Sequence, residues 1–334
     1  MKKIDEDIKY VASIAEMLGF ANKSFLVTGA TGMIGRNLVN VLKCITSEDK
    51  IYVLGLNQDE VNSVYLNSKL KKISFASLDS IDESVDYVFH LASPTNSIWL
   101  KEKPVETIDF IYSSTKTILD FARQHSSSVL YVSSMEVYGE IFDKKKKNEK
   151  ELGYLDLTNT RNSYPEAKRM CELLCYSFFC EFSLDVKCVR LAQTFGAGTN
   201  YNDQRVFGYF ARCAVNKENI VLGTKGDSFG NYCYLFDTLS SFFYALSKGN
   251  PGETYNVVGD NCRYTIFDLA SFVVNNIAHH DIQITFNISN SQYPAPTMLN
   301  MDNSKLKGIG WRPKYSIEDM FTRMIDNWRD EGII

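Results

Sequence analysis

The sequence predicts an α/β protein with a doubly wound, Rossmann-type parallel sheet and a smaller C-terminal lobe. A short apolar strand at residues 24–28 runs directly into a glycine-rich turn and a helix, the order that opens such a sheet. Further apolar strands then alternate with helical segments as far as residue 192. Beyond that residue the alternation weakens and the segments shorten, which indicates a separate, smaller lobe.

These changes along the chain predict three parts. Residues 1–22 repeat apolar side chains at spacings of three and four, which indicates an amphipathic helix on the outside of the first domain. Residues 23–192 form the predicted dinucleotide-binding domain, and residues 193–334 form most of the smaller lobe. Segments near residues 232–258 are expected to return to the first domain, with a strand close to residues 232–237.

The composition argues against several classes of protein. The chain has 334 residues and a formal net charge of −4, so neither nucleic acid nor an anionic membrane is an expected partner. No apolar run approaches the roughly 20 residues that span a bilayer. The charged N-terminus lacks the apolar core of a signal peptide, so we expect a cytoplasmic protein with reduced cysteines. Cys171 and Cys175 share a helix face without a second ligand pair, so no metal site is expected.

The glycine-rich turn has the spacing Gly-x-x-Gly-x-x-Gly at residues 29–35. Gly29 suits the tight turn, Gly32 the close approach of a pyrophosphate, and Gly35 the packing of helix on strand. An ordinary strand-to-helix turn is the alternative interpretation. Because the turn lies between a strand and a helix near the N-terminus, we expect it to bind a dinucleotide.

The second strand, residues 51–56, would place the adenosine ribose of that dinucleotide at its end. A carboxylate usually binds the ribose of NAD there, but this strand ends at Asn57, the first acid is Asp59, and no arginine stands there either. We therefore expect NAD or NADP, and the missing acid favours NADP. Asp79, after a short strand predicted at residues 73–75, could reach the adenine.

Two later strands end in polar loops at the same edge of the sheet. Residues 85–92 form a buried strand that ends before Ser93, and His90 inside it is expected to have a structural role. The strand at residues 129–132 opens into Ser133, Ser134 and Glu136. These hydroxyls and this carboxylate are candidates to touch a substrate, although a turn with capping serines would look the same.

Tyr164 and Lys168 lie four residues apart in a predicted helix, so they stack on one face. An ammonium beside a phenol favours the phenolate, so the pKa of Tyr164 should fall from its ordinary value of about 10. Tyr164 is therefore a candidate general acid and base. Such a pair is also common on protein surfaces, and the upstream motifs decide in favour of chemistry.

Together these segments resemble the extended short-chain dehydrogenases/reductases, in the branch of nucleotide-sugar epimerases, dehydratases and decarboxylases. The resemblance covers residues 22–330, nearly the whole chain. The segments that carry it have the family's order and spacing: 28–35, 90–93, 133–139, 164–168, 190–196, 202–207 and 255–257.

The resemblance implies a role for each candidate residue. Tyr164 exchanges a proton with a sugar hydroxyl while the nicotinamide exchanges a hydride with the same carbon, and Ser134 hydrogen-bonds the reacting oxygen. Lys168 holds the cofactor ribose and lowers the pKa of the tyrosine. The expected cofactor contacts are Gly29, Thr31, Gly32, Met33, Ile34, Gly35, Asn57, Asp79, Leu91, Ala92, Ser93, Tyr164 and Lys168. The expected substrate contacts are Ser93, Ser134, Met135, Gln193, Thr194 and Arg205, with Glu136 as a further catalytic residue.

Two departures from the family's pattern bear on the reaction. The 4,6-dehydratases carry an Asp-Glu pair where this chain has Met135 and Glu136, and a thioether cannot donate the proton that dehydration needs. Glu136, with the Arg205-Val206 segment, resembles the UDP-glucuronate decarboxylases instead. Gly230 stands where the family often has an arginine that pairs with the nucleotide diphosphate. Arg205 or Lys225 would then have to bind the diphosphate, or the substrate differs.

The resemblance thus ranks the functions. The first is NAD(P)-dependent hydride transfer on a nucleotide-activated sugar or sugar alcohol, by a ketone reductase or an epimerase that makes precursors of a surface polysaccharide such as capsule or lipopolysaccharide. A UDP-glucuronate-type decarboxylase is second, a 4,6-dehydratase third, and a non-catalytic cofactor-bound protein last. The expected partners are a nucleotide-linked sugar and a second copy of the chain, in a homodimer that packs the helix at residues 104–124 and the tyrosine helix.

Overall fold

The predicted α/β fold with a doubly wound parallel sheet is confirmed. The structure, a computed structural model, describes residues 2–95, 97–288 and 296–334. Across these residues the main sheet has seven strands, all parallel, in the order β10-β6-β5-β4-β1-β2-β3. The strands are β1 (Phe25–Thr28), β2 (Ile51–Leu54), β3 (Lys71–Ile73), β4 (Tyr87–His90), β5 (Ser128–Ser134), β6 (Val186–Leu191) and β10 (Thr254–Val257).

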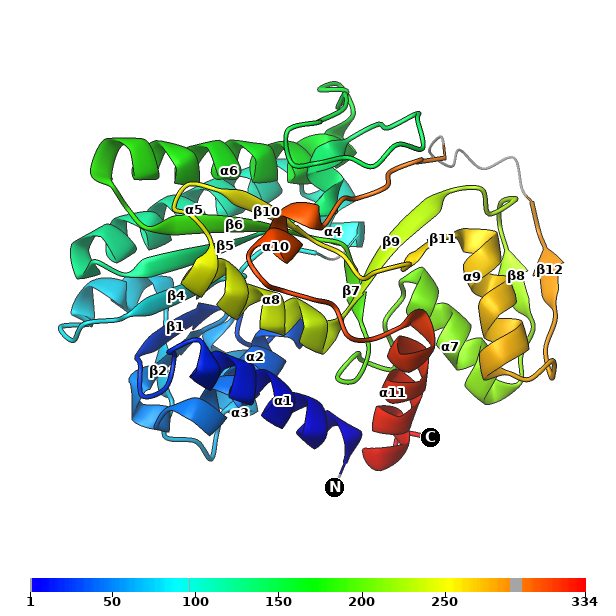
Figure 1. Cartoon of the computed structure of the whole chain (residues 1–334), viewed down its shortest axis with the longest axis horizontal. Helices are drawn as coiled ribbons and strands as arrows, with labels where there is room; N and C mark the ends of the chain where they lie inside the picture. The colour runs from blue at the N-terminus through cyan, green and yellow to red at the C-terminus, as the bar shows by residue number, and fades with distance from the viewer. Residues whose placement is uncertain (1, 96, 289–295) are drawn as a thin grey trace.

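Helices cover both faces of this sheet (Figure 1). On one face lie α5 (Pro104–His125) and α6 (Ser163–Phe182), which pack on β4, β5 and β6. On the other face lie α2 (Met33–Ile45) and α8 (Leu235–Lys248), with α1 (Lys3–Met17) packed outside them. The central strands are therefore apolar on both sides: Tyr131 packs toward α5 and α6, and its neighbour Leu130 packs toward the other layer.

The smaller lobe is built on two short sheets, one of β11-β9-β7 and one of β12-β8. Its elements are β7 (Gln193–Phe195), α7 (Val206–Asn216), β8 (Ile220–Leu222), β9 (Phe229–Tyr234), β11 (Arg263–Thr265), α9 (Ile266–Phe272), a π-helical turn (Val273–Ile277), β12 (Ile284–Phe286) and α11 (Ile317–Asp330). Figure 1 shows these elements beside the edge of the main sheet where β7 follows β6.

The strand expected near residues 232–237 does not return to the main sheet. β9 pairs with β7 and β11, and Asp237 lies in the first turn of α8. The chain returns through α8, which packs on β5 and β6, and through β10, which pairs with β6. Apolar side chains favour burial without specifying which sheet they join. The domain boundaries at residues 22 and 192 stay a prediction.

The shorter elements adjust the predicted boundaries. The strand expected at residues 73–75 is β3 and ends at Ile73, because Ser74 and Ser77 cap the 3₁₀-helix η2 (Phe75–Ser80). The remaining elements are α3 (Gln58–Val64), α4 (Ser97–Glu102), α10 (Ser304–Gly308) and the 3₁₀-helices η1 (Glu48–Lys50), η3 (Met135–Tyr138) and η4 (Thr160–Asn162).

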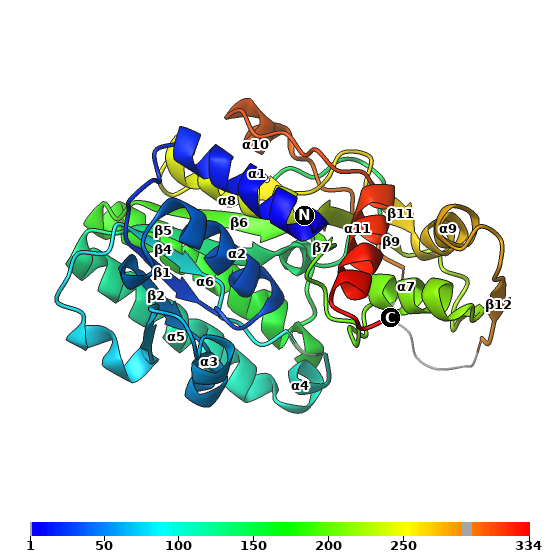
Figure 2. The same cartoon turned by 90° about the horizontal axis from the view of Figure 1, so that it is seen from below.

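Helix α1 confirms the amphipathic helix expected before the first strand. It packs on α2, α8 and α11 and buries Val11, Ala12 and Ala15. Figure 2 shows it lying along α8 on the outside of the sheet. Met1, the first residue of the predicted helix, lies outside the described residues.

Candidate active site

The glycine-rich turn has room beside Gly32 that the protein does not fill. A side chain at Gly35 would place its first carbon 2.2 Å from the Gly29 carbonyl oxygen, so glycine is required there for packing. At Gly32 the backbone is extended, with φ −70° and ψ 166°, and the nearest atom would be 3.4 Å away. The protein therefore does not itself require glycine at position 32, whereas the approach of a ligand would.

The start of α2 adds hydrogen-bond donors to this space. The N–H groups of a helix's first turn have no intrahelical partners, and the N-cap here, Gly32, has no side chain that could accept from them. Free N–H groups and the positive end of the helix dipole suit a phosphate group. The residues present thus fit the pyrophosphate of a dinucleotide.

A buried histidine connects this turn to the next strand end. The Thr28 and Thr115 hydroxyls lie 2.7 Å from His90 Nδ1 and 3.1 Å from Nε2. Burial lowers the pKa of His90 to about 3, so the ring is neutral, and the expected structural role is confirmed. Thr28 Oγ1 also accepts hydrogen bonds from the Leu91 and Ala92 N–H groups at 3.1 and 3.0 Å. Because a side chain at Gly29 would meet Ala92 N at 2.9 Å, residues 91–93 begin against the glycine turn.

Tyr164 lies in the first turn of α6 and meets hydroxyls from two strand ends. The Ser134 and Ser93 side chains both act on its phenol and lower its pKa. Ser93 Oγ is buried and makes no hydrogen bond of normal geometry within residues that the structure describes. Three hydroxyls therefore converge next to the glycine turn, and one of them is available to a ligand.

Lys168 lies one helical turn further along α6 and is 2% exposed. Its Nζ donates to the Val132 carbonyl oxygen at 2.8 Å and lies 4.8 Å from the Tyr131 ring centroid and 5.9 Å from that of Tyr164. Burial lowers the pKa of Lys168 to about 8. Lys168 is therefore still mostly charged at neutral pH and loses its proton as the pH rises through about 8.

The phenol of Tyr164 does not show the lowered pKa that the sequence suggests. Burial raises its pKa, and the nearby Glu136 carboxylate raises it further. The ammonium of Lys168 lies nearer the ring of Tyr131 and is bound to a carbonyl group. In the protein alone Tyr164 is consequently a proton donor, and it becomes a base only when positive charge is added close to it.

A salt bridge that sequence reasoning missed lies beside this tyrosine. Arg161, in η4, donates from Nη2 to Glu136, with N–O distances of 3.0 and 3.2 Å to the two carboxylate oxygens. Arg161 lowers the pKa of Tyr164, against the effect of Glu136. The available signal was its position three residues before Tyr164, which places both on one side of a helical turn.

The model of the NAD dependent epimerase/dehydratase family matches residues 25–258. The chain belongs to this family. The predicted resemblance to its nucleotide-sugar branch is confirmed, and so is the prediction of a nicotinamide-dependent enzyme of this class. The expected lean to NADP over NAD stays a prediction.

One relative of the chain is UDP-glucuronic acid decarboxylase 6 of Arabidopsis thaliana. The two are 26% identical over 314 residues, which cover 92% of this chain and 90% of the relative. A solved UDP-N-acetylglucosamine 4-epimerase of Methanobrevibacter ruminantium has a TM-score of 0.79 and 21% identity, covering 93% of this chain and 99% of its own. The dTDP-glucose 4,6-dehydratase DesIV of Streptomyces venezuelae, solved with NAD bound, has a TM-score of 0.75 and 20% identity, covering 92% and 97%. At such identities the two structures show a shared fold.

The other expected cofactor contacts are less closely grouped than the residues of the glycine-rich turn. Asn57 caps α3: its side-chain oxygen accepts from the Asp59 and Glu60 N–H groups at 2.8 and 3.4 Å, which leaves only its amide nitrogen for a ribose. Thr31 lies against Gly55, and Met33 accepts a hydrogen bond from Thr199 at 3.4 Å. Asp79 is exposed in η2. Their roles toward a cofactor, and those of Ile34, Leu91 and Ala92, stay predictions.

Arg205 and Thr194, two of the other expected substrate contacts, are already bonded to groups of the protein. Arg205 binds Asp203 in a fork, with Nε–Oδ1 and Nη2–Oδ2 distances of 3.0 and 2.6 Å, and the carboxylate neutralises much of its charge. The Thr194 hydroxyl donates to the Ala192 carbonyl oxygen at 3.1 Å, while Gln193 is half-buried. Met135 packs against the core. The described contacts do not join Arg205 to Tyr164, so its predicted role remains untested.

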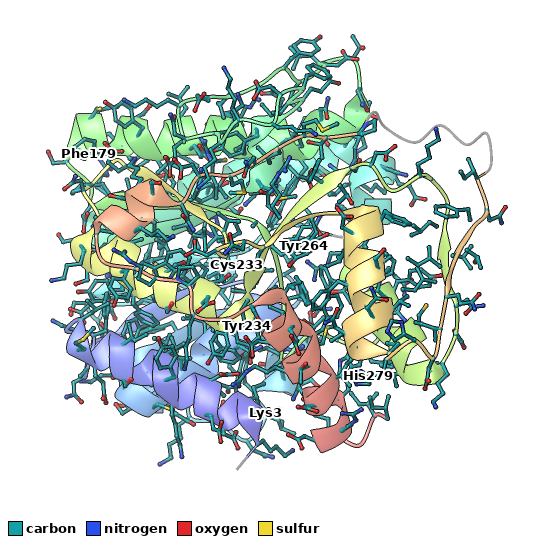
Figure 3. The ribbon with its side chains drawn as sticks, turned by 45° about the vertical axis from the view of Figure 1, so that its right-hand side comes forward. Lys3, Phe179, Cys233, Tyr234, Tyr264 and His279 are labelled. Atoms are coloured by element: carbon teal, nitrogen blue, oxygen red, sulfur yellow. The ribbon has the colours of Figure 1, made fainter. Side chains whose placement is uncertain are left out.

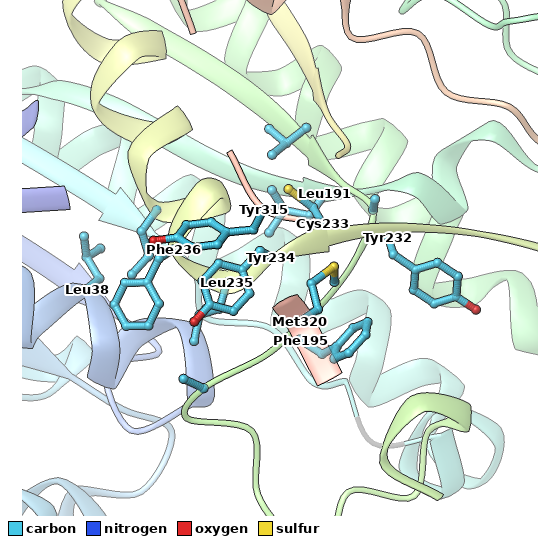
Figure 4. Packing of buried hydrophobic residues seen from close by; sticks show 14 of the residues in the cluster. Leu38, Leu191, Phe195, Tyr232, Cys233, Tyr234, Leu235, Phe236, Tyr315 and Met320 are labelled. Atoms are coloured by element: carbon cyan, nitrogen blue, oxygen red, sulfur yellow. The ribbon is translucent and has the colours of Figure 1, made fainter. Parts of the chain in front are cut away.

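Gly230 has a physical explanation in the fold. A side chain there would place its first carbon 2.3 Å from the Tyr232 hydroxyl, so the tyrosine occupies the space. Tyr232 is fully buried, its hydroxyl has no hydrogen-bond partner within the described ranges, and Figure 4 shows it near Phe195 and Met320. An arginine at position 230 would therefore require this ring to move.

Two further findings concern the described residues alone. None of their helices has both the length and the apolar character needed to cross a membrane. No group of three or more of their His, Cys, Asp and Glu side chains is placed to hold a metal ion. Whether the protein is cytoplasmic stays a prediction.

Proposed function

We propose that the enzyme interconverts a secondary alcohol and a ketone on a nucleotide-linked sugar, with NAD or NADP as the hydride partner. The convergence of Ser93, Ser134 and Tyr164 beside the glycine turn carries this proposal, because it puts proton-handling groups next to the cofactor-binding backbone. Lys168, buried one helical turn along α6 from Tyr164, is the residue that would bind the cofactor beside this tyrosine.

In this mechanism the protein positions the reacting oxygen and moves its proton. The nicotinamide, when bound, supplies or accepts the hydride. Ser134 donates a hydrogen bond to the sugar oxygen, and Tyr164 gives that oxygen a proton or takes one from it. Lys168 would orient the cofactor ribose beside this phenol. Arg161 holds the Glu136 carboxylate beside the site.

Decarboxylation of a nucleotide-linked uronic acid is the first candidate for the complete reaction. A ketone formed next to the carbon that bears the carboxylate makes a β-keto acid, whose C–C bond breaks to release carbon dioxide and leave the electron pair as an enolate. The Tyr164 and Ser134 hydroxyls would stabilise the enolate oxygen, and the enolate then takes up a proton and the ketone is reduced back. Met135 suits this reaction, which needs no acid at that position, and the UDP-glucuronic acid decarboxylase relatives support it.

Ketone reduction or epimerisation is the second candidate. The raised pKa keeps Tyr164 protonated in the protein alone, which is the form that donates a proton to a ketone oxygen during reduction. Dehydration ranks below both because Met135 cannot donate a proton, and a non-catalytic protein would not need the converging hydroxyls.

Two measurements distinguish the candidates. The nicotinamide content of the purified protein is determined first: tightly held NAD indicates a reaction without net oxidation, and readily exchanged NADPH indicates a reductase. The protein is then incubated with UDP-, CDP-, GDP- and dTDP-linked sugars. We expect carbon dioxide release from UDP-glucuronate for the decarboxylase and NADPH consumption with a keto sugar for the reductase. No product from any nucleotide sugar would contradict the proposal.

The choice between NAD and NADP is also open to a direct test. Arg36 is exposed one residue after Gly35, and burial raises the pKa of Tyr65 while Arg36 acts in the opposite direction, so its guanidinium lies near this phenol. Tyr65 itself donates to the Ala30 carbonyl oxygen at 2.7 Å, within the glycine turn. With no acid at the end of β2, we propose that Arg36 binds the 2′-phosphate of NADP.

Replacing Arg36 with serine should then weaken NADP⁺ binding about tenfold to a hundredfold and leave NAD⁺ binding unchanged, because only the phosphate pairs with the guanidinium. Titration calorimetry of both cofactors measures the difference. Lys43→Ser, at the far end of α2 in an ion pair with Glu48, is the matched control and should change neither affinity. Equal losses for both cofactors would show that Arg36 only supports the fold.

Two consequences of the resemblance stay predictions. One is the use of the product in surface-polysaccharide synthesis. The other is a homodimer, which would cover the exposed apolar side chains of two neighbouring helices. These are Val105, Ile108 and Tyr112 of α5 and Met170, Leu173 and Tyr176 of α6.

A further inference from the structure

A buried ion pair lies directly behind the proposed catalytic residues. Glu172 of α6 accepts hydrogen bonds from Arg190 of β6, at 2.6 Å from Nη2 and at 3.0 and 3.2 Å from Nε. Ser133 of β5 donates to the same carboxylate at 2.5 Å. The Glu172 and Arg190 side chains are only 11% and 5% exposed. One helix carboxylate thus holds two strands, and Ser133 and Arg190 are themselves paired in the sheet.

This carboxylate belongs to a regular set of contacts between α6 and the end of β5. Lys168 and Glu172 are one helical turn apart, so they share a face of α6. Lys168 binds the Val132 carbonyl group, Glu172 binds the Ser133 hydroxyl, and the Ser134 hydroxyl acts on Tyr164. Three consecutive residues of β5 therefore each meet one of these side chains of α6. A change at Glu172 would alter the docking of the helix that carries Tyr164 and Lys168.

Charge links Glu172 to Lys168 as well. Burial lowers the pKa of the lysine, while Cys171 first and Glu172 second act in the opposite direction. The other titratable groups that face Lys168 come from all the surrounding elements: Cys171, Cys175 and Tyr164 of α6, Cys188 of β6, Tyr131 of β5 and His90 of β4. Within this set of described neighbours, Glu172 is the carboxylate and the others are thiols, phenols and an imidazole.

We propose that Glu172 is a positioning residue that keeps Lys168 charged and holds α6 against the end of β5. This inference rests on the proposed role of Lys168 toward the cofactor. Arg190 and Ser133 anchor the carboxylate, so its negative charge stays on the face of α6 that carries the lysine. If Arg190 fully neutralised this carboxylate, the ionisation of Lys168 would not depend on Glu172.

The test is the pH dependence of NADH and NADPH binding by Glu172→Gln, measured by calorimetry between pH 6.5 and 9.5. In the wild type, affinity should fall as pH rises through the pKa of Lys168, about 8, because the ammonium that holds the ribose is lost. Without the Glu172 charge the ammonium is less stable, so the fall should move to lower pH, by about one pH unit. Binding needs no turnover, so this result is independent of whether the proposed reaction is correct.

Glu166→Gln is the matched control. Glu166 lies on the same helix in a salt bridge with Arg169, at 3.1 Å, so the variant makes the same chemical change in a similar pair. It should keep the wild-type pH dependence. Ser133→Ala removes one bond to Glu172 but no charge, and the fall in affinity should again stay at the wild-type pH.

Glu172→Gln leaves the buried Arg190 without its partner, and the variant could fail to fold. The double variant Glu172→Gln/Arg190→Gln removes both charges and should still move the fall in affinity to lower pH. An unmoved curve in either folded Glu172 variant would overturn the proposal. So would a wild-type affinity that does not change between pH 6.5 and 9.5.

Discussion

Replacing Tyr164 with phenylalanine should abolish most turnover while the protein still folds and binds its cofactor. The phenol is the group that gives the sugar oxygen its proton or takes one from it, and general acid–base catalysis contributes about a hundredfold to ten-thousandfold to a rate. The ring itself packs in a buried apolar cluster and lies over Lys168, and phenylalanine keeps those contacts. Turnover with the substrate identified from the nucleotide-sugar panel should fall by that factor, and NADH affinity should stay near the wild-type value.

Tyr255→Phe provides the control for this change. Tyr255 is 1% exposed in β10, and its hydroxyl accepts a hydrogen bond from the Asn250 N–H at 2.9 Å, so the variant also removes one buried phenol hydroxyl. It lies outside the proposed site and should keep turnover. Near-normal activity of Tyr164→Phe would contradict the mechanism, and equal losses in both variants would indicate a loss of structure instead.

The sequence predicts the cofactor side of this fold well because local chemistry determines it there. Gly35 admits no side chain for reasons of packing within one turn, and the strand and helix around it follow from neighbouring residues. The apolar surroundings of His90 predict a structural role, and its two threonine partners confirm that role. In both cases the contacts join segments that a Rossmann-type fold places side by side, so the fold class already predicts that these segments meet.

The smaller lobe was harder to predict because its contacts join distant segments. The apolar residues of β9 predict a strand, but only the structure shows that this strand pairs with β7 and β11 and not with the main sheet. The displacement of a side chain at Gly230 by Tyr232 depends on how one strand residue folds over another two positions away. The Asp203 carboxylate that neutralises Arg205 was visible in the sequence, but its forked geometry was not.

At the site, too, the sequence predicts which residues lie together but not how buried they are or which charges lie near them. The spacing of Tyr164 and Lys168 predicts that they share a helix face, and the structure confirms that they do. Spacing does not report burial, which raises the pKa of Tyr164, or the carboxylate of Glu136, which raises it further. The sequence does not predict a role for Arg161, because its position three residues before Tyr164 is a weak signal and a single arginine in a polar segment forms no periodic pattern.

A buried carboxylate in α1 ties this helix to the smaller lobe. Asp7 is 1% exposed and accepts hydrogen bonds from the Tyr234 and Tyr315 hydroxyls at 2.5 and 2.6 Å and from Arg323 Nη1 at 2.9 Å. Figure 4 shows Tyr234 and Tyr315 side by side near Phe236, and Figure 3 shows Lys3 at the end of α1 beside α11. Helix α1 thus joins β9 and α11 while packing on α2 and α8.

Asp7→Ala should consequently lower the free energy of unfolding by about 3–5 kcal/mol, because it leaves the Arg323 guanidinium and two buried phenols without their acceptor. Urea unfolding followed by circular dichroism measures this loss. Asp5→Ala removes an exposed carboxylate two residues away and should change the free energy by less than about 0.5 kcal/mol. If Asp7→Ala were as stable as Asp5→Ala, the cost of burying this carboxylate would match the gain from its bonds, and apolar packing alone would hold α1 in place.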